Sequence, residues 1–203
     1  MVQHAAVAIQ PVELPDNFDL LAMHARLPDR YPFLLESVAT APDVRGLVEA
    51  HDILFAFPGE TLRLDRNFQL HGPKATTGNH FLPALDAWWR RVRTPTEPDA
   101  SLPFTGGWFL VLGYELVGQI EPGINTPPPP EGPVAFATRI PVALVRNRRT
   151  NQAWIVAEND QSAAIDRVRT DVATCRGHSC STSAAGRLVG GIVESEPSAF
   201  LTA

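Results

Sequence analysis

Proline limits the length of every regular element in this chain. The sequence has 19 prolines in 203 residues, nearly twice the usual share of ~5%. Many of them cluster in two segments, 95–99 (PTEPD) and 122–133 (PGINTPPPPEGP). Because consecutive prolines donate no backbone hydrogen bonds, we expect the second segment to be an extended, solvated connection. We interpret it as a spacer between strands, in preference to a PxxP-type ligand.

Short strands are predicted on both sides of these connections. One group is a meander of two strands and a short third strand, separated by turns at 58–60 and 65–67. The other is a longer β segment that bends at Pro141, turns and returns as a hairpin. The expected strands are 53–57, 61–64, a short strand after Asn67, the segment from Val134 to Val145, and 153–157, with the hairpin turn at 146–151.

Two segments, 79–93 and 161–175, predict amphipathic helices, because their apolar residues recur three or four positions apart. Asn79 is expected to cap the first helix. The second helix presents Ile165, Val168 and Val172 on one face. Strands in runs with a few helices, and no sustained βαβ alternation, predict an α+β fold with mostly antiparallel sheets and flanking helices.

The charge balance argues against nucleic acid as a partner. The formal net charge is -5 and the pI is about 5.6, whereas binding to phosphates needs clustered basic residues. We interpret the basic runs 90–93 and 146–149 as a solvated helix face and a hairpin turn. The start MVQHAAVAIQP lacks the basic and the long apolar segments of a secretory signal, and no apolar run reaches the ~20 residues of a spanning helix. We therefore expect a soluble, cytoplasmic protein without a membrane partner.

The two cysteines do not predict a metal site. Cys175 and Cys180 have only His178 nearby, whereas a structural zinc ion needs four ligands. A disulfide is not expected in a reducing compartment. We interpret both cysteines as incidental thiols, and we expect no metal in this chain.

The stretch PFTGGWFLVLGYELVGQIEP (103–122) combines a Gly-Gly pair, an apolar run and a Gly-Tyr-Glu sequence, and is the least ordinary segment of the chain. It is not a phosphate loop, because its glycines precede a β-rich run and the only lysine is Lys74. We expect a buried, bent strand in which two glycines allow a tight turn or a close approach, and a third marks a bulge or a close contact within the strand. A glutamate in so apolar a run needs a partner if it is buried. The residues assigned to this structural signature are Gly106, Gly107, Gly113, Tyr114 and Glu115.

No catalytic constellation is predicted. The sequence lacks GxSxG and HExxH motifs, and His24, His51, His71 and His80 are scattered. The residues alone indicate a binding or scaffold domain with no catalytic residue of its own.

Two segments resemble known proteins. RYPFLLESVA (30–39) resembles the PFLLES signature of the chorismate-utilising enzymes, which include anthranilate synthase component I and aminodeoxychorismate synthase component I. The stretch 103–122 resembles the second signature of that family, which has a Gly-Gly pair, a Gly-Tyr pair and an acidic residue. Together with DILFAFPGETLRL (52–64), it is more similar to the aminodeoxychorismate synthase branch.

The resemblance implies three parts of the chain. Residues 1–26 are expected to be an N-terminal lead-in, and residues 27–186 the N-terminal domain of the component I fold. Residues 187–203 are expected to begin a linker to an absent chorismate-binding domain. In the family that domain carries the catalytic residues and the Mg²⁺ site, so this chain alone is expected to be inactive and without a cofactor of its own.

The implied function is part of aminodeoxychorismate synthase component I. That enzyme converts chorismate and ammonia to 4-amino-4-deoxychorismate for p-aminobenzoate and folate synthesis, and a glutamine amidotransferase subunit supplies the ammonia. This chain would provide scaffold and partner surface. Two alternatives stay open: the same part of anthranilate synthase component I, in tryptophan synthesis, and a free-standing regulatory or interaction module.

The resemblance also implies an effector pocket for tryptophan at Leu34, Leu35, Glu36 and Ser37. A carboxylate can bind the α-ammonium group, and the hydroxyl of Ser37 can donate to the ligand carboxylate. The leucines and Phe33 can form apolar walls for an indole ring. The competing interpretation is a strand with core leucines and a solvated glutamate, and the sequence favours it over tryptophan binding by this chain alone.

Overall fold

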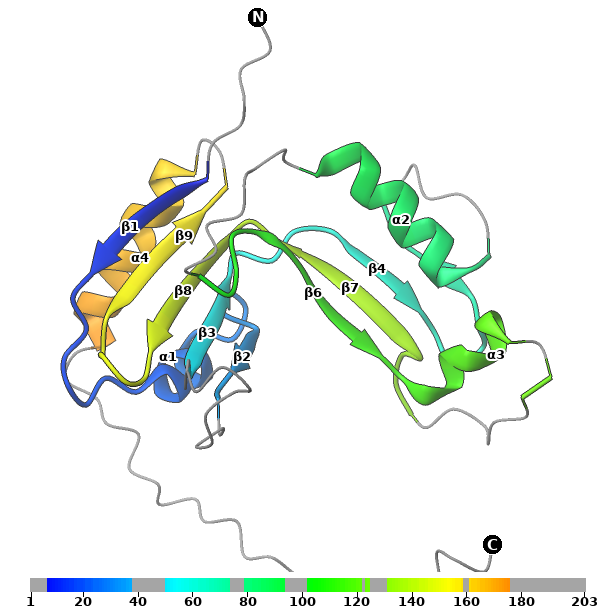
Figure 1. Cartoon of the computed structure of the whole chain (residues 1–203), viewed down its shortest axis with the longest axis horizontal. Coiled ribbons are helices and arrows are strands. Elements are labelled where there is room, and N and C mark those ends of the chain that lie inside the picture. The colour runs from blue at the N-terminus through cyan, green and yellow to red at the C-terminus, as the bar shows by residue number, and fades with distance from the viewer. Residues whose placement is uncertain are drawn as a thin grey trace, which may run out of the picture.

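The computed structural model describes residues 7–37, 50–73, 79–93, 102–121, 123–124, 131–158 and 161–175. It confirms the α+β class, because helices accompany two sheets in which every strand pair is antiparallel. The two sheets lie side by side and form an arch (Figure 1). The strands are β1 (Ala8–Val12), β2 (Phe33–Leu35), β3 (His51–Ala56), β4 (Thr61–Leu64), β5 (Leu70–His71), β6 (Gly107–Leu112), β7 (Ala135–Ile140), β8 (Val142–Asn147) and β9 (Ala153–Ala157). The helices are α1 (Leu20–Arg26), α2 (Phe81–Val92), α3 (Val117–Ile120) and α4 (Ser162–Cys175), with a 3-10 turn, η1, at Tyr114–Leu116.

The five-stranded sheet has the order β1-β9-β8-β3-β2. A buried cluster joins one of its faces to α1 and α4, with Leu54 and Leu144 from the strands and Met23 from α1. The apolar stripe predicted for 161–175 is confirmed, because Ile165, Val168 and Val172 of α4 are buried in this cluster. Cys175 ends α4 as a buried free thiol, and burial raises its pKa, which keeps the thiol protonated.

Residues 8–26 belong to the fold and are more than a lead-in. Strand β1 pairs with β9 along its whole length, and Leu20 and Met23 of α1 are buried in the same cluster as α4. The boundary expected at Leu27 therefore does not separate a tail from a domain. The prediction failed because β1 contains Pro11, which weakens its strand pattern, and because α1 spans only 7 residues. Pro11 is tolerated because β1 is an edge strand.

The four-stranded sheet has the order β5-β4-β7-β6, and α2 covers one of its faces (Figure 1). Leu62 and Leu64 of β4 pack with Phe81 and Trp88 of α2 in a second buried cluster. The predicted alternation in β4 is confirmed, because both leucines are buried while Thr61 and Arg63 are exposed. The predicted helix over 79–93 is confirmed as well, and α2 begins at Phe81.

Strands β3 and β4 were expected as neighbours in a meander, and this prediction is wrong. They lie in different sheets: β3 pairs with β2 and β8, and β4 pairs with β5 and β7. The chain turns at Phe57, which has a φ of 54°, and the Gly59 N–H then donates to the Arg139 carbonyl at 2.8 Å. The break predicted at Pro141 is confirmed, and there the chain crosses back from β7 to β8.

The cap of α2 also differs from the expectation. Asn79 does not cap the helix, since the N-cap residue is His80, which makes no capping bond with its side chain. Gln119 of α3 replaces it: its Oε1 accepts from the Phe81 N–H at 2.9 Å and its Nε2 donates to the Asn79 carbonyl at 3.1 Å. A residue from a distant segment thus satisfies the free donor at the helix start.

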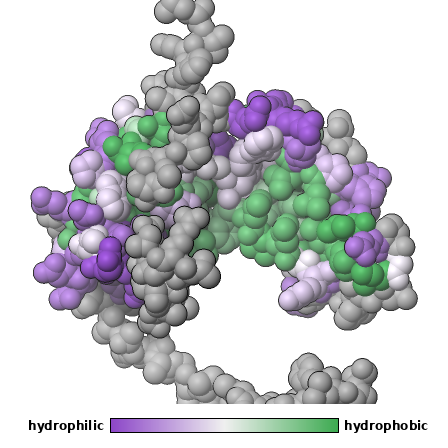
Figure 2. Space-filling view, in the orientation of Figure 1, coloured by the Kyte–Doolittle hydropathy of each residue, from purple (hydrophilic) through white to green (hydrophobic). Residues whose placement is uncertain are grey.

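Residues 103–122 do not form one buried, bent strand. Strand β6 ends at Leu112, and η1 and α3 follow. Its last three residues, Leu110, Val111 and Leu112, are exposed, and β6 is an edge strand of the four-stranded sheet. Figure 2 shows the resulting apolar surface as a green area along the arch.

Among the helices that the structure describes, none has the length and apolar character needed to cross a bilayer. Predictions for the segments 95–99 and 125–130, for His178 and Cys180, and for 187–203 fall outside the described residues.

The turn between β4 and β5 is held by Asp65. Its Oδ1 accepts from the backbone N–H groups of Asn67 (2.8 Å) and Gln69 (2.9 Å), and its Oδ2 lies 2.8 Å from His71 Nε2. The bond with His71, and then those from the backbone, hold the pKa of Asp65 below its ordinary value.

We expect Asp65→Asn to remove an acid-sensitive contribution to stability. Because the folded-state pKa is lowered, the carboxylate stabilises the fold above the ordinary aspartate pKa of ~3.9, and this contribution disappears as the pH falls through the folded-state value. The difference in unfolding free energy between wild type and variant should therefore shrink between about pH 6 and about pH 2 in urea titrations. A difference that stays constant over this range would contradict the assignment.

Candidate functional site

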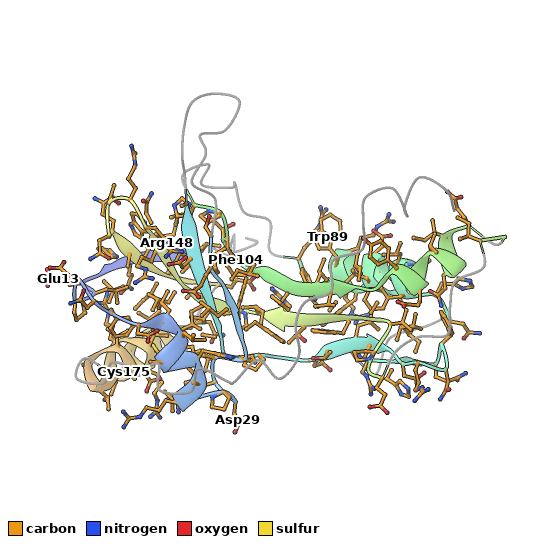
Figure 3. The ribbon with its side chains drawn as sticks, turned by 90° about the horizontal axis from the view of Figure 1, so that it is seen from below. Glu13, Asp29, Trp89, Phe104, Arg148 and Cys175 are labelled. Carbon is orange, nitrogen blue, oxygen red and sulfur yellow. The ribbon has the colours of Figure 1, made fainter. Side chains whose placement is uncertain are left out.

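The two segments that carry the family resemblance meet in space. Phe33 begins β2 and Phe109 lies in β6, so each belongs to an edge strand of its sheet. Their rings stack with centroids 4.0 Å apart and planes 4° apart. Phe55 of β3 contacts both Phe109 (5.3 Å) and Phe104 (5.2 Å), and Phe104 lies at the junction of the two sheets (Figure 3). An aromatic seam of these four rings therefore joins the sheets.

A cavity of about 350 Å³ lies beside this seam. Asp19 caps helix α1, since its Oδ1 accepts from the Ala22 N–H at 3.0 Å, and the helix buries Leu20 and Met23 in the core. Leu21 and His24 of the same helix are thereby left to face the cavity. The residues that line it are Leu21, His24, Pro32, Phe33, Leu34, Glu36 and Phe109.

The ring of His24 is fixed in the wall of this cavity. Its Nδ1 lies 2.6 Å from the carbonyl oxygen of Tyr31. A carbonyl oxygen only accepts, so Nδ1 carries the proton and donates, and Nε2 is an acceptor while the ring is neutral. Tyr31 is itself held by Asp171, whose Oδ2 accepts from the Tyr31 hydroxyl (2.7 Å) and from Arg30 Nη1 (2.6 Å). Burial and this hydrogen bond raise the pKa of Tyr31.

A buried ion cluster holds the chain that follows β2. Asp52 of β3 is completely buried, and its Oδ2 accepts from Nε (3.1 Å) and Nη2 (2.7 Å) of Arg146, its cross-strand neighbour. Its Oδ1 accepts from the Ser37 N–H at 3.2 Å. Arg148 Nη1 donates to the Ser37 carbonyl oxygen at 2.5 Å and lies 3.6 Å from Asp52 Oδ1. With these donors the buried carboxylate is compensated.

The four residues predicted for an effector pocket are separated by the strand. Leu34 and Glu36 line the cavity. Leu35 lies on the opposite face of β2, because side chains alternate along a strand, and it is exposed. Ser37 is bound through its backbone to Asp52 and Arg148.

The Gly-Gly pair of the structural signature permits a close approach of a charged pair. Gly106 and Gly107 have φ values of 110° and 135°, which favour glycine. A Cβ on Gly106 would overlap with the carboxylate of Glu158. Glu158 forms a salt bridge with Arg139, whose Nη1 donates to the Gly107 carbonyl at 2.6 Å. Burial raises the pKa of Glu158, and its bonds with Arg139 act in the opposite direction.

The other signature residues lie just beyond β6. The Gly113 N–H donates to the Val134 carbonyl at 2.8 Å, and a Cβ on Gly113 would approach that oxygen equally closely. This is the close contact expected there, although it comes after the strand and not within it. Tyr114 is 94% exposed. Glu115 lies in η1 and is half-buried.

The edge of β6 is an uncovered apolar face. Leu110, Val111 and Leu112 are between 39% and 52% exposed, and Ile120 of α3 is 55% exposed. In Figure 2 the green surface extends over β6 toward α3. The strand contains no charged residue and no proline, the features that usually protect a sheet edge. Side chains alternate along a strand, so Leu110 and Leu112 project to one side of β6 and Val111 to the other. We call this exposed edge, formed by the four residues, the apolar face.

Comparison with models of known protein families gave no match for this chain, and no curated protein matches it significantly. Within the described ranges, no three His, Cys, Asp or Glu residues are grouped so that they could hold a metal ion. The residues and their geometry therefore carry the functional interpretation.

The arrangement is suited to binding. The cavity combines aromatic and aliphatic walls with the carboxylate of Glu36 and the imidazole of His24. This set fits a small ligand that has an apolar or aromatic part and an amino group. The apolar face fits the surface of another protein or domain.

Residues of this region that are not selected from the sequence include His24, Asp52 and Arg146. A charged residue within an apolar strand indicates a buried ion pair, and Asp52 and Arg146 both lie in such strands. Arg146 belongs to β8 and not to the solvated turn expected at 146–149. His24 follows Leu21 by three positions and shares a helix face with it. The sequence does not show that this face lies beside β2.

Proposed function

We propose that this chain is the N-terminal, non-catalytic domain of a chorismate-utilising enzyme, of the aminodeoxychorismate synthase component I type. In this role it supplies a scaffold and a surface for the chorismate-binding domain, which carries the Mg²⁺ site and the chemistry. A glutamine amidotransferase subunit supplies ammonia, and the product leads to p-aminobenzoate and folate in the cytoplasm.

The observation that supports this proposal most is the position of the apolar face. Strand β6 belongs to one of the two resemblance segments, and the aromatic seam joins it to the other. An exposed apolar strand edge next to such a seam favours a permanent protein partner. The chorismate-binding domain is the partner that the resemblance implies. An uncovered face of this kind is unfavourable for a free-standing regulatory module.

The cavity supports an accompanying role in effector binding. Glu36 offers a carboxylate to an α-ammonium group, and Phe33, Leu34 and Phe109 offer apolar walls to an aromatic side chain. Tryptophan, which the resemblance implies, has both of these groups. The effector role therefore belongs to the same proposal.

Reconstitution tests the proposed function. The purified chain is mixed with the chorismate-binding domain of the same organism's aminodeoxychorismate synthase, together with chorismate, Mg²⁺ and ammonium. We expect no product from the chain alone and a rise in 4-amino-4-deoxychorismate when both are present. Leu110→Asp combined with Leu112→Asp should weaken binding of the two components by about tenfold or more, because it places charges on the apolar face.

Ala163→Asp is the control, because Ala163 is exposed on α4, which packs on the five-stranded sheet and not on β6. It should bind the second domain as the wild type does. Product from the chain alone would contradict a scaffold role, and anthranilate as the product of the mixture would move the assignment to the other branch. A wild-type chain that neither binds nor activates the domain would overturn the proposal.

A further inference from the structure

We propose that Asp52 is a positioning residue of the cavity: together with Arg146 and Arg148 it fixes the two walls of the cavity relative to each other. Asp52 does not line the cavity. It acts through the Glu36–Ser37 segment on one side and through α1 on the other. The inference rests on the proposed effector role for its ligand, an α-amino acid with an aromatic side chain.

The first wall is fixed through the backbone of Ser37. In the antiparallel β2–β3 ladder, Leu35, the last residue of β2, pairs with Ile53. Asp52 is therefore the next residue of β3 beyond the end of β2. There the Asp52 carboxylate accepts from the Ser37 N–H, and Arg148 binds the carbonyl of the same residue. Glu36 lies between a paired residue and a residue held at both backbone groups. The backbone of Glu36 is therefore fixed, and so is the Cα position from which its side chain extends.

The second wall is fixed through Arg146. Its Nε and Nη2 bind Asp52, while its Nη1 donates to the carbonyl oxygen of Phe18 at 2.8 Å. Phe18 directly precedes Asp19, the N-cap of α1, and α1 carries Leu21 and His24 into the cavity. One planar guanidinium group thus connects the carboxylate that holds Ser37 with the start of the helix opposite.

The charge of Asp52 is what makes this connection. A buried carboxylate orients several donors at once, and a ligand site needs its recognition groups held by a supporting shell of such bonds. Within the described ranges, two further carboxylate–arginine pairs are at least partly buried, Arg30–Asp171 and Arg139–Glu158, and neither binds the Glu36–Ser37 segment. Arg139–Glu158 lies at the junction of the sheets and provides a comparison.

The test uses Asp52→Asn, which keeps the size of the side chain and removes its charge. L-tryptophan is the probe, with its affinity measured by calorimetry, and NMR gives the hydrogen-exchange rate of the Ser37 amide and the ring resonances of His24. We expect affinity to fall about tenfold or more, because hydrogen bonds to a charged group are lost, with faster exchange at Ser37 and a shifted His24 signal. Glu158→Gln is the control, and it should change stability while leaving all three readouts as in the wild type.

Arg148→Gln provides a milder second variant, since the Arg148 side chain is 44% exposed and the substitution removes the bond to the Ser37 carbonyl. It should speed exchange at Ser37 and weaken tryptophan binding about threefold; it decides the matter if Asp52→Asn does not fold. If the wild type binds no tryptophan but Ser37 and His24 still respond, the effector role fails and the positioning role stands. Folded Asp52 and Arg148 variants with wild-type exchange at Ser37 and wild-type His24 signals would overturn the positioning role.

Discussion

Gly106→Ala is expected to lower the free energy of unfolding by about 3–5 kcal/mol, through backbone strain and a broken ion pair. The φ of 110° at this residue is unfavourable for any side chain. The new methyl group would also lie 2.6 Å from Cγ of Glu158 and closer still to its Oε1. Glu158 would have to leave Arg139, whose side chain is only 15% exposed and would lose its partner.

Two other glycines separate these contributions. Gly132 has a φ of 119°, but a methyl group added there would have no neighbouring atom within 4 Å, so Gly132→Ala should show only the strain, roughly 1–2 kcal/mol. Gly118 lies in α3 with neither restriction, and Gly118→Ala should be neutral or slightly stabilising. Urea denaturation followed by far-UV circular dichroism measures all three. Equal losses for Gly106→Ala and Gly132→Ala would show that the contact with Glu158 is unimportant.

Trp88→Ala is expected to cost about 3–5 kcal/mol of unfolding free energy, since it removes the largest side chain from the core under α2. Trp88 is 2% exposed and meets the Trp108 ring at 5.4 Å in an edge-to-face contact. Its loss leaves a cavity between α2 and the four-stranded sheet.

The adjacent residue is a matched control. Trp89 is 41% exposed (Figure 3). The guanidinium carbon of Arg93 lies 4.7 Å from the centroid of its ring. Trp89→Ala should therefore cost about 1 kcal/mol or less. Circular dichroism is the appropriate probe, because both substitutions remove a fluorophore. Similar losses at the two positions would mean that α2 does not pack in this orientation.

The sequence predicts local structure well because periodicity is a local property. Helix α4 and the hairpin of β8 and β9 follow directly from apolar spacing and turn residues. The pairing partners of a strand are not a local property. A pattern shows which face of a strand is buried, but not which strand lies beside it, and so the corner at Phe57 looks like a hairpin turn in the sequence.

The cavity shows the same limit. Leu34 and Glu36 belong to one short motif and can be selected together. His24 and Phe109 reach the cavity from a short helix and from the other sheet, and only the tertiary fold brings them there. Asp52 and Arg146 become recognisable as partners only once the register of β3 and β8 is known.

The order of strands along the chain has a consequence for synthesis on the ribosome. The four-stranded sheet is formed entirely by residues 61–140, which lie between β3 and β8 of the other sheet. Its strands all emerge before β8 exists, whereas the five-stranded sheet needs β8 and β9 to connect β1 to β3. Contacts that are close in sequence form with less loop-closure entropy. The four-stranded sheet can therefore assemble first, whereas the five-stranded sheet forms only after β8 and β9 have been synthesised.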